Sequence, residues 1–398
     1  MLRLLTVTAG VLISLISNAY ATPSFSRQMG VSCTACHSQN SYPALNAFGR
    51  KFKASGFTLM GQQGLIESSE VNGSEKGSLL SLPNILNTSF VVKIRAQNGD
   101  EEESKLEFPD EAALLIGGRV AEHIGTFIEI GYNSGDDKFT LANIKFPITY
   151  AFNEYTLGVV PYRTEGFGAA ASFEVLNTGA VRGSRVLEDR KTISAQQYIG
   201  TAHEAEGLGA YLYTDLWHIV YSAYMPAIGT VTDYSPAHYF RAAMTPTVGA
   251  WDLGFGAQLW SGTSTYDQGD VSHKDKTDAY AIDFQAMGSV NDMPLSFFAT
   301  YANAKNDADS VYNTGVNDKY AVTFLTEVGV IPSLFNLSAG YRIADNGKAE
   351  KSSEDKAIVG AKYFVAENMQ LQLNYTYDFD ALPQKDENHV IFMLYGGF

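Results

Sequence analysis

The chain has 398 residues, and its 43 acidic and 28 basic side chains give a formal net charge of −15, which argues against nucleic acid as a partner. Its 23 Tyr, 23 Phe and 3 Trp exclude a disordered polypeptide, and two cysteines are too few for disulfides to stabilise the fold. After the first 21 positions no run of 18 apolar residues follows, which excludes a transmembrane helix there.

Residues 1–21 are typical of a secretory signal peptide. Arg3 gives a weakly positive start, an apolar run continues to Ile16, and small residues end the segment at Ala21. The apolar run is too short for a spanning helix. We expect cleavage after Ala21 and export, and the loss of Arg3 would change the net charge from −15 to −16.

Both cysteines lie in one short motif, Cys33-Thr34-Ala35-Cys36-His37. The C-x-x-C-H pattern is typical of c-type haem attachment, because two thiols at this spacing reach the two vinyl groups of one porphyrin. The adjacent His37 then becomes the proximal iron ligand. The alternatives are a disulfide or a thioredoxin-like redox pair, although no βαβ pattern surrounds the motif. We therefore predict one haem c.

The segment after the motif, residues 43–53, has the spacing of an amphipathic helix. Leu45, Phe48 and Phe52 share one face. We expect this face either to cover the porphyrin or to pack on another apolar surface.

Four nearby residues are candidate haem contacts. Arg50 and Lys53 carry the charge that haem propionates would attract. Met60 or Met29 is a candidate distal ligand, since a thioether would raise the potential of the iron. An open distal position is an alternative, as is one of the remaining histidines, which are His123, His203, His218, His238, His273 and His389.

The haem segment, residues 22–62, is very small, and domains below about 40 residues rarely fold alone. A segment of this length is also too short to surround a haem. A linker over 63–84 separates it from the remainder, residues 85–398. We expect the remainder to supply the missing cover.

From about residue 85 the chain alternates with period two. In residues 369–379, for example, Met369, Leu371 and Leu373 are interleaved with Gln370 and Gln372. Segments of about ten residues with one apolar and one polar face are typical of membrane β-barrels. A soluble all-β protein is the alternative, but it would rarely sustain so many strands of this length.

The strand count follows from the connections. A first count gives about 17 alternating segments, including 192–202, whereas bacterial single-chain barrels have even numbers, short periplasmic turns and long outer loops. Without 192–202 the long and short connections alternate. We predict a 16-stranded antiparallel barrel with both chain ends in the periplasm and the haem segment plugging or lining its lumen. The expected long connections are 97–109, 133–137, 164–205, 226–237, 263–277, 305–317, 345–355 and 380–388, and the short ones are 121–124, 151–153, 215–216, 249–250, 290–293, 331–334 and 366–368.

Charged residues fall into two predicted groups. By strand parity the lumen receives Lys93, Arg95, Arg119, Glu129, Lys145, His218 and Arg342. The outer loops are acidic, and their carboxylates serve either to gather divalent cations weakly or merely to keep the loops soluble. The loop residues are Asp100, Glu101, Glu102, Glu103, Glu107, Asp136, Asp137, Asp307, Asp309, Glu350, Glu354 and Asp355.

One stretch carries a family resemblance, with the pattern Pro23-Ser24-Phe25, Arg27-Gln28, Cys33-x-x-Cys36-His37 and Pro43-x-Leu45-Asn46-x-Phe48-Gly49-Arg50-x-Phe52-Lys53-x-x-Gly56. It resembles the haem segment of fused monohaem cytochrome–porins, the outer-membrane iron oxidases of Fe(II)-oxidising bacteria. The resemblance covers residues 23–59, and the barrel half is similar in architecture and size. Members of that family often carry Met two residues before the first Cys, where this chain has Val31.

The resemblance implies a function for the whole chain. It implies oxidation of extracellular Fe²⁺, with the electron passed inward to a periplasmic cytochrome or other carrier by a protein embedded in outer-membrane lipid. We expect an electron-transfer oxidoreductase, an iron oxidase that needs no catalytic side chain because the haem carries the chemistry. The alternatives are a porin-like channel with a structural haem plug and a conduit that exports electrons to an extracellular metal.

Overall fold

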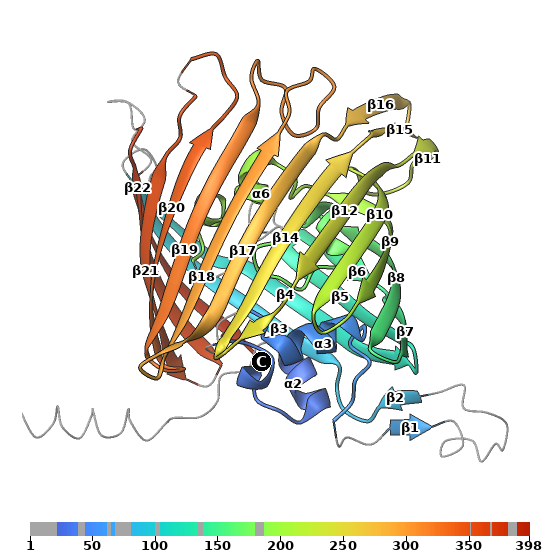
Figure 1. Cartoon of the computed structure of the whole chain (residues 1–398), viewed down its shortest axis with the longest axis vertical. Helices are drawn as coiled ribbons and strands as arrows, with labels where there is room; N and C mark the ends of the chain where they lie inside the picture. Colours follow the sequence, from blue (N-terminus) through green and yellow to red (C-terminus); the bar gives the residue numbers. More distant parts are fainter. Residues whose placement is uncertain are drawn as a thin grey trace, which may run out of the picture.

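The computed structural model describes residues 22–38, 44–61, 65–67, 81–99, 104–133, 138–179, 187–350, 352–366, 368–380 and 388–398. In this part of the chain a closed antiparallel β-barrel carries a small helical segment at one end (Figure 1). We call that end the N-terminal mouth and the opposite end the loop end. The expected signal peptide, residues 1–21, lies outside the described residues, as do the acidic residues 100–103 and 136–137.

The N-terminal segment contains helix α2 (Pro23–Met29), the 3₁₀ turn η1 (Cys33–Ala35) and helix α3 (Ala47–Ala54). Proline in the first turn favours the start of α2, which ends at Gly30 in the left-handed conformation with φ 66°. Within the expected linker, the short strands β1 (Leu65–Glu67) and β2 (Ser81–Pro83) pair with each other.

The predicted helix over 43–53 is shorter than expected. Asn46 caps α3 by accepting a hydrogen bond from the Gly49 backbone, and Leu45 stands before the cap in a β-bridge with His37. The expected apolar face is therefore only partly formed, because Phe48 is 39% exposed whereas Phe52 is buried.

The described barrel has 16 strands, as predicted. Two of them are interrupted, since β6 and β7 lie between the same neighbours and β12 and β13 both pair with β14. Pro147 and Pro246 stand in the two gaps, and proline cannot donate a ladder hydrogen bond. The strands are β3 (Thr88–Gly99), β4 (Lys105–Ala121), β5 (Ile124–Asn133), β6 (Lys138–Lys145) with β7 (Ile148–Phe152), β8 (Tyr155–Thr164), β9 (Ala205–Tyr213), β10 (Trp217–Met225), β12 (Ala237–Met244) with β13 (Thr247–Val248), β14 (Trp251–Ser261), β17 (Ala279–Val290), β18 (Met293–Ala304), β19 (Lys319–Ile331), β20 (Phe335–Asp345), β21 (Lys356–Ala366), β22 (Met369–Asp378) and β23 (His389–Gly397).

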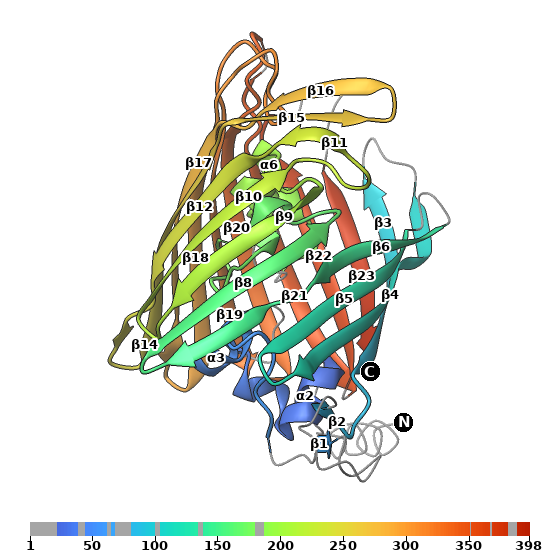
Figure 2. The ribbon, with the colours of Figure 1, turned by 90° about the vertical axis from the view of Figure 1, so that its right-hand side faces the viewer.

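Long and short connections alternate as predicted, with the short turns at the N-terminal mouth (Figure 1). Three of the predicted long connections contain strand residues beyond their first and last positions. Most of the predicted loop 97–109 belongs to β3 and β4, so Glu107 lies in a strand, and the predicted loop 226–237 contains a short strand, β11 (Thr232–Ser235). Residues 263–277, predicted as a loop, contain β15 (Thr263–Gln268) and β16 (Val271–Lys276). Strand β15 pairs with both β16 and β11, which gives a three-stranded sheet at the loop end (Figure 2).

The outer face of the barrel is apolar, and part of its inner face is polar. Along β22, Leu373 and Tyr375 are exposed, whereas Gln372, Asn374 and Thr376 are at most 1% exposed. A soluble protein would reverse this pattern, so the strands have the faces of a barrel of the outer-membrane type.

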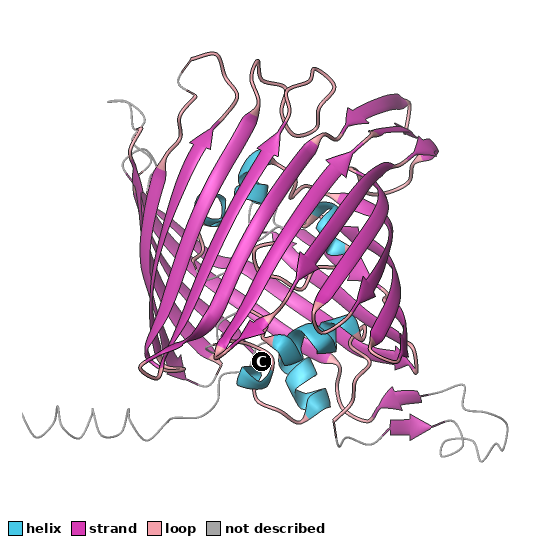
Figure 3. Ribbon diagram, viewed as in Figure 1, coloured by secondary structure: helices cyan, strands magenta, loops and turns pink. Residues whose placement is uncertain are grey.

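The connection from β8 to β9, residues 165–204, folds into the barrel, and we call it the lumen segment. Its helical turns are η2 (Gly168–Ala171), α5 (Arg190–Ile193) and α6 (Ala195–Ile199), drawn inside the ring of strands in Figure 3. Residues 192–202, which the predicted strand count excludes, lie mostly in these helices. The lumen segment packs with inward side chains of β8–β20 in one apolar core.

Within the described residues, no helix is long and apolar enough to cross a bilayer.

Candidate functional site: a cavity beside the two cysteines

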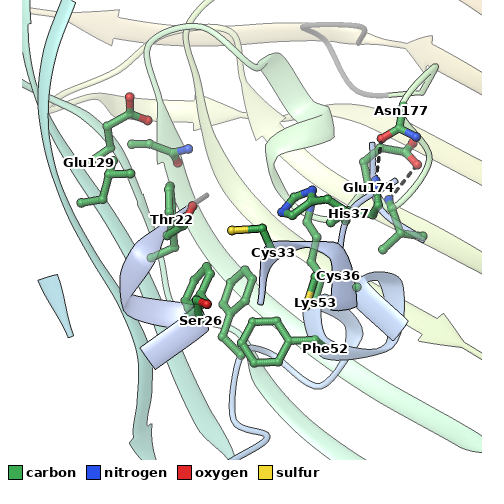
Figure 4. Close-up of a pocket in the computed structure, with 18 of the residues that line it drawn as sticks. Thr22, Ser26, Cys33, Cys36, His37, Phe52, Lys53, Glu129, Glu174 and Asn177 are labelled. Atoms are coloured by element: carbon green, nitrogen blue, oxygen red, sulfur yellow. Dashed lines mark hydrogen bonds between the residues drawn. The ribbon is translucent and has the colours of Figure 1, made fainter. Parts of the chain in front are cut away.

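A tight turn holds the C-x-x-C-H motif. The backbone N–H groups of Cys36 and His37 both donate to the Cys33 carbonyl, at 3.1 and 2.8 Å. As a result the side chains of Cys33, Cys36 and His37 all line one cavity (Figure 4). Cys33 is 3% exposed, and burial raises the pKa of the half-buried Cys36 thiol.

Helix α3 clamps this turn from one side. The Asn46 side chain donates to the Ala35 carbonyl at 3.0 Å, and its backbone N–H donates to the Cys36 carbonyl at 3.0 Å. Gly49 allows the close approach, because a Cβ at this position would lie 2.2 Å from the Cys36 carbonyl oxygen. The motif and α3 are therefore joined by hydrogen bonds and close packing.

The cavity has a volume of about 320 Å³, within the range of sites that hold small molecules and cofactors. Four phenylalanines form much of one wall. The rings of Phe25 and Phe57 stack with centroids 4.9 Å apart, Phe52 meets Phe25 edge-on at 5.2 Å, and Phe127 of β5 lies 6.3 Å from Phe25. An aromatic, mainly apolar wall suits a flat apolar ligand.

The barrel and the lumen segment close the rest of the cavity. Barrel residues thus lie beside the cysteine motif, whereas the expected shielding of a haem stays a prediction. The barrel contributes Val91, Glu111, Ala113, Leu115, Phe127, Glu129, Asn143, Lys145 and Tyr395, and the lumen segment contributes Phe167, Ala170, Ala171 and Glu174 to Asn177.

Arg50 has a different role from the one we expected. It was a candidate propionate contact, but it does not line the cavity. Its guanidinium, 1% exposed, forms two hydrogen bonds of 2.7 and 2.9 Å with the Asp252 carboxylate on β14. The residue therefore anchors α3 to the barrel wall.

Further contacts bind the N-terminal segment to the barrel. Gln28 donates to the Gly117 carbonyl at 2.7 Å, the Ser24 backbone donates to Ser89 at 2.8 Å, and Tyr211 donates to the Ala54 carbonyl at 2.6 Å. These bonds reach β3, β4 and β9, so the segment is fixed to separate parts of the rim.

The other candidate contacts divide between the cavity and its surroundings. Lys53 lines the cavity, and burial lowers the pKa of its ammonium group. Met29 also lines it, whereas Met60 does not. Among the described residues around the cavity, His37 is the only imidazole.

Sequence reasoning missed part of this site. Parity placed Glu129 and Lys145 in the lumen, yet nothing in the pattern showed that they would face the cysteines. Glu111 and Glu174 also line the cavity. An alternating pattern defines which face of a strand is inward, but not which inward residues lie level with a separate segment.

A second, polar cavity of about 430 Å³ lies along the wall formed by β3–β6 and β23. It is lined by Arg95, Asp110 and Glu188, among others, and it shares Glu111 and Glu129 with the first cavity. The two cavities therefore adjoin.

Some carboxylates at the loop end are already paired. Asp307 lies 2.6 Å from the Lys276 ammonium group, and Asp309 lies 2.7 Å from that of Lys274. Carboxylates held in ion pairs are less available to a divalent cation, so these two residues do not support the cation-gathering alternative.

No protein-family model matches the chain, and no curated protein matches it. Several solved structures are similar to the chain. An anion-selective porin from Comamonas acidovorans is 12% identical, with 78% of this chain and 98% of that chain covered and a TM-score of 0.48. A loop-deletion mutant of OmpT, an outer membrane protein of Vibrio cholerae, is 14% identical over 79% and 99% of the chains, with a TM-score of 0.46. The outer membrane protein OpdK from Pseudomonas aeruginosa is 12% identical over 78% and 98%, with a TM-score of 0.45.

Proposed function

We propose that this chain is an outer-membrane electron-transfer protein that carries one covalently attached haem c at the N-terminal mouth of its barrel. In this proposal it is an exported member of the monohaem cytochrome–porin type that oxidises extracellular Fe²⁺. The electron released by Fe²⁺ reduces a periplasmic carrier. The observation that carries the proposal is the cavity on which both cysteines and His37 converge.

The residues present fit such a cofactor. Two thiols and an imidazole from one turn face a cavity with a wall of four phenylalanines. Cys33 and Cys36 would hold the haem covalently, His37 would bind its iron, and Met29 is the better placed of the two candidate thioethers. A haem at this site supplies reversible one-electron chemistry.

The chain itself would hold the cofactor in position and surround it with apolar side chains. The barrel wall and the lumen segment cover part of the cavity, and the low polarity of these surroundings would tune a bound redox centre. The Arg50 ion pair and the hydrogen bonds from Gln28 and Tyr211 hold the cavity at the rim. A redox centre there is closest to carriers on the N-terminal side of the membrane.

The experiment compares wild type with the Cys33→Ala, Cys36→Ala double variant in detergent. Wild type is expected to show a Soret band and haem that stays attached on denaturing gels, and the variant to show neither while keeping its β-barrel circular dichroism. Fe²⁺ added to oxidised wild type should then reduce it. A wild type without a Soret band, or one that stays oxidised with Fe²⁺, would refute the proposal, and too low a midpoint potential would favour electron export.

A second candidate function is a porin-like channel with a structural plug, and the polar cavity along β3–β6 favours it. A channel would conduct ions in a planar bilayer whether or not haem is attached. We expect little conductance from wild type, because the lumen segment packs against β8–β20. A conductance typical of open porins would favour the channel instead.

A further inference from the structure

Two lysines converge on the cavity from different parts of the fold. Lys53 lies on α3, and Lys145 ends β6 on the barrel wall. Both are half-buried, and both line the cavity. The Lys145 ammonium group stands 5.9 Å from the ring centroids of Phe57 and Phe127 and 3.4 Å from the Ala171 carbonyl.

Among the described residues, neither lysine forms a salt bridge, and the carboxylates that act on them through space are Glu174 for Lys53 and Glu129 for Lys145. Every salt bridge described for the cavity's carboxylates involves other cations: Glu111 lies 2.7 Å from Lys93, and Glu174 lies 2.7 Å from Arg241. Glu129 is the remaining carboxylate of the lining. The cavity is therefore lined by two ammonium groups that no described salt bridge engages and by three carboxylates, two of which, Glu111 and Glu174, are paired with cations outside the lining.

A charge in such surroundings is costly unless an opposite charge compensates it. The apolar walls strengthen any pairing that does occur, because the local dielectric is low. Two ammonium groups facing one cavity are thus suited to a ligand that carries two carboxylates.

We propose that Lys53 and Lys145 bind the two propionates of the haem, so that the barrel wall as well as the N-terminal segment holds the cofactor. This inference rests on the proposed function. It adds a residue of the barrel, Lys145, to a site that the cysteine motif alone would assign to the first 62 positions. It also gives the cofactor a structural role, as a link between α3 and β6.

The test measures the midpoint potential of purified full-length protein by optical redox titration between pH 5.5 and 8. The variants are Lys53→Gln, Lys145→Gln and their combination. Lys145→Arg keeps the charge, and Lys51→Gln is a matched control because Lys51 lies on the same helix but is exposed and does not line the cavity. Covalent haem content is measured in every sample.

The variants should keep their haem, because the thioether bonds do not involve lysine. Removing a cation favours the oxidised, more positive centre, so the potential should fall. We expect each Gln variant to lower the equilibrium constant for reduction at least tenfold, which is about 59 mV for one electron. The potential should also become more pH-dependent, because an unpaired propionate takes up a proton more readily. Lys145→Arg and Lys51→Gln should behave as wild type.

The outcomes separate the two proposals. A wild type without covalent haem overturns the proposed function. If the Gln variants at Lys53 and Lys145 carry haem but have the same midpoint potential and pH dependence as Lys51→Gln, the inference is overturned and the proposed function stands. If Lys145→Gln does not fold, Lys145→Met replaces it as a neutral side chain of similar length. The resonance Raman bands of the wild-type propionates are a separate measure, and bands at the position of free propionates overturn the inference.

Discussion

Gly49 lies where α3 crosses the carbonyl of Cys36, and no side chain fits there. We predict that Gly49→Ala separates the helix from the cysteine turn, because its Cβ would stand 2.2 Å from a backbone oxygen that cannot rotate away. Overpacking of this kind costs about 1–3 kcal/mol. Under the proposed function, haem content per chain should then fall, as measured by absorbance against protein concentration. Gly131→Ala is the control, since its Cβ would meet only the Ala142 Cβ, at 3.5 Å. Full haem loading in Gly49→Ala would show that the close contact is dispensable.

The pair between Arg50 and Asp252 is a second prediction at the scale of single residues. Arg50→Ala leaves a partly buried carboxylate without its partner, and breaking such a pair costs about 3–5 kcal/mol. The N-terminal segment should then detach more often, and limited proteolysis should cut within residues 22–61 at a higher rate. Lys51→Ala removes an exposed pair with Asp215, worth about 0–1 kcal/mol, and should leave the cleavage rate unchanged. Equal rates in the two variants would argue against the anchor.

At the scale of elements, the lumen segment is held by charges as well as by apolar packing. Arg241 of β12 contacts Glu174 at 2.7 Å and Asp283 of β17, so one guanidinium joins the segment to two strands. We predict that Arg241→Leu releases this part of the segment, because two carboxylates lose their shared cation. Conductance in planar bilayers should rise several-fold, whereas Arg241→Lys, which keeps the charge but not the planar fork, should have a smaller effect. An unchanged conductance in Arg241→Leu would mean that the apolar contacts suffice.

Elements differ in how far the sequence determines them. The alternation in residues 369–379 predicts β22 and its two faces, since the spacing of side chains on a strand has no other period. The lumen segment is different. Its position depends on contacts between residues far apart in the chain, such as Thr178 with Asp283, which no local pattern contains. The pair between Arg50 and Asp252 is not predictable for the same reason, because the two residues are 202 positions apart.

At the scale of the whole molecule, the number of strands is predictable because a closed bacterial barrel of one chain has an even number of them. The requirement for an even number, together with the alternation of long and short connections, is enough to remove residues 192–202 from the count. That the cysteine turn and Lys145 line one cavity is not predictable in this way, since it depends on how the N-terminal segment sits on the rim. The cavity therefore emerges from the assembly of two parts, neither of which encloses it alone.

Because the barrel and the N-terminal segment are separate parts of the fold, we predict that the barrel folds without the N-terminal segment. Strand β23 closes the ring by pairing with β3, and Phe398 and Phe90 exchange backbone hydrogen bonds of 2.7 and 2.9 Å. Because β3 is the first strand of the ring, residues 22–81 contribute no strand to the described barrel. A chain that lacks 22–81 should still form a barrel that runs anomalously on unheated gels, without haem and with raised conductance. A chain that lacks 389–398 should not, because β22 and β3 would then expose unpaired backbone to lipid. If the first truncation failed to assemble, the N-terminal segment would be part of the folding core, and the separation into a barrel and a docked plug would be wrong.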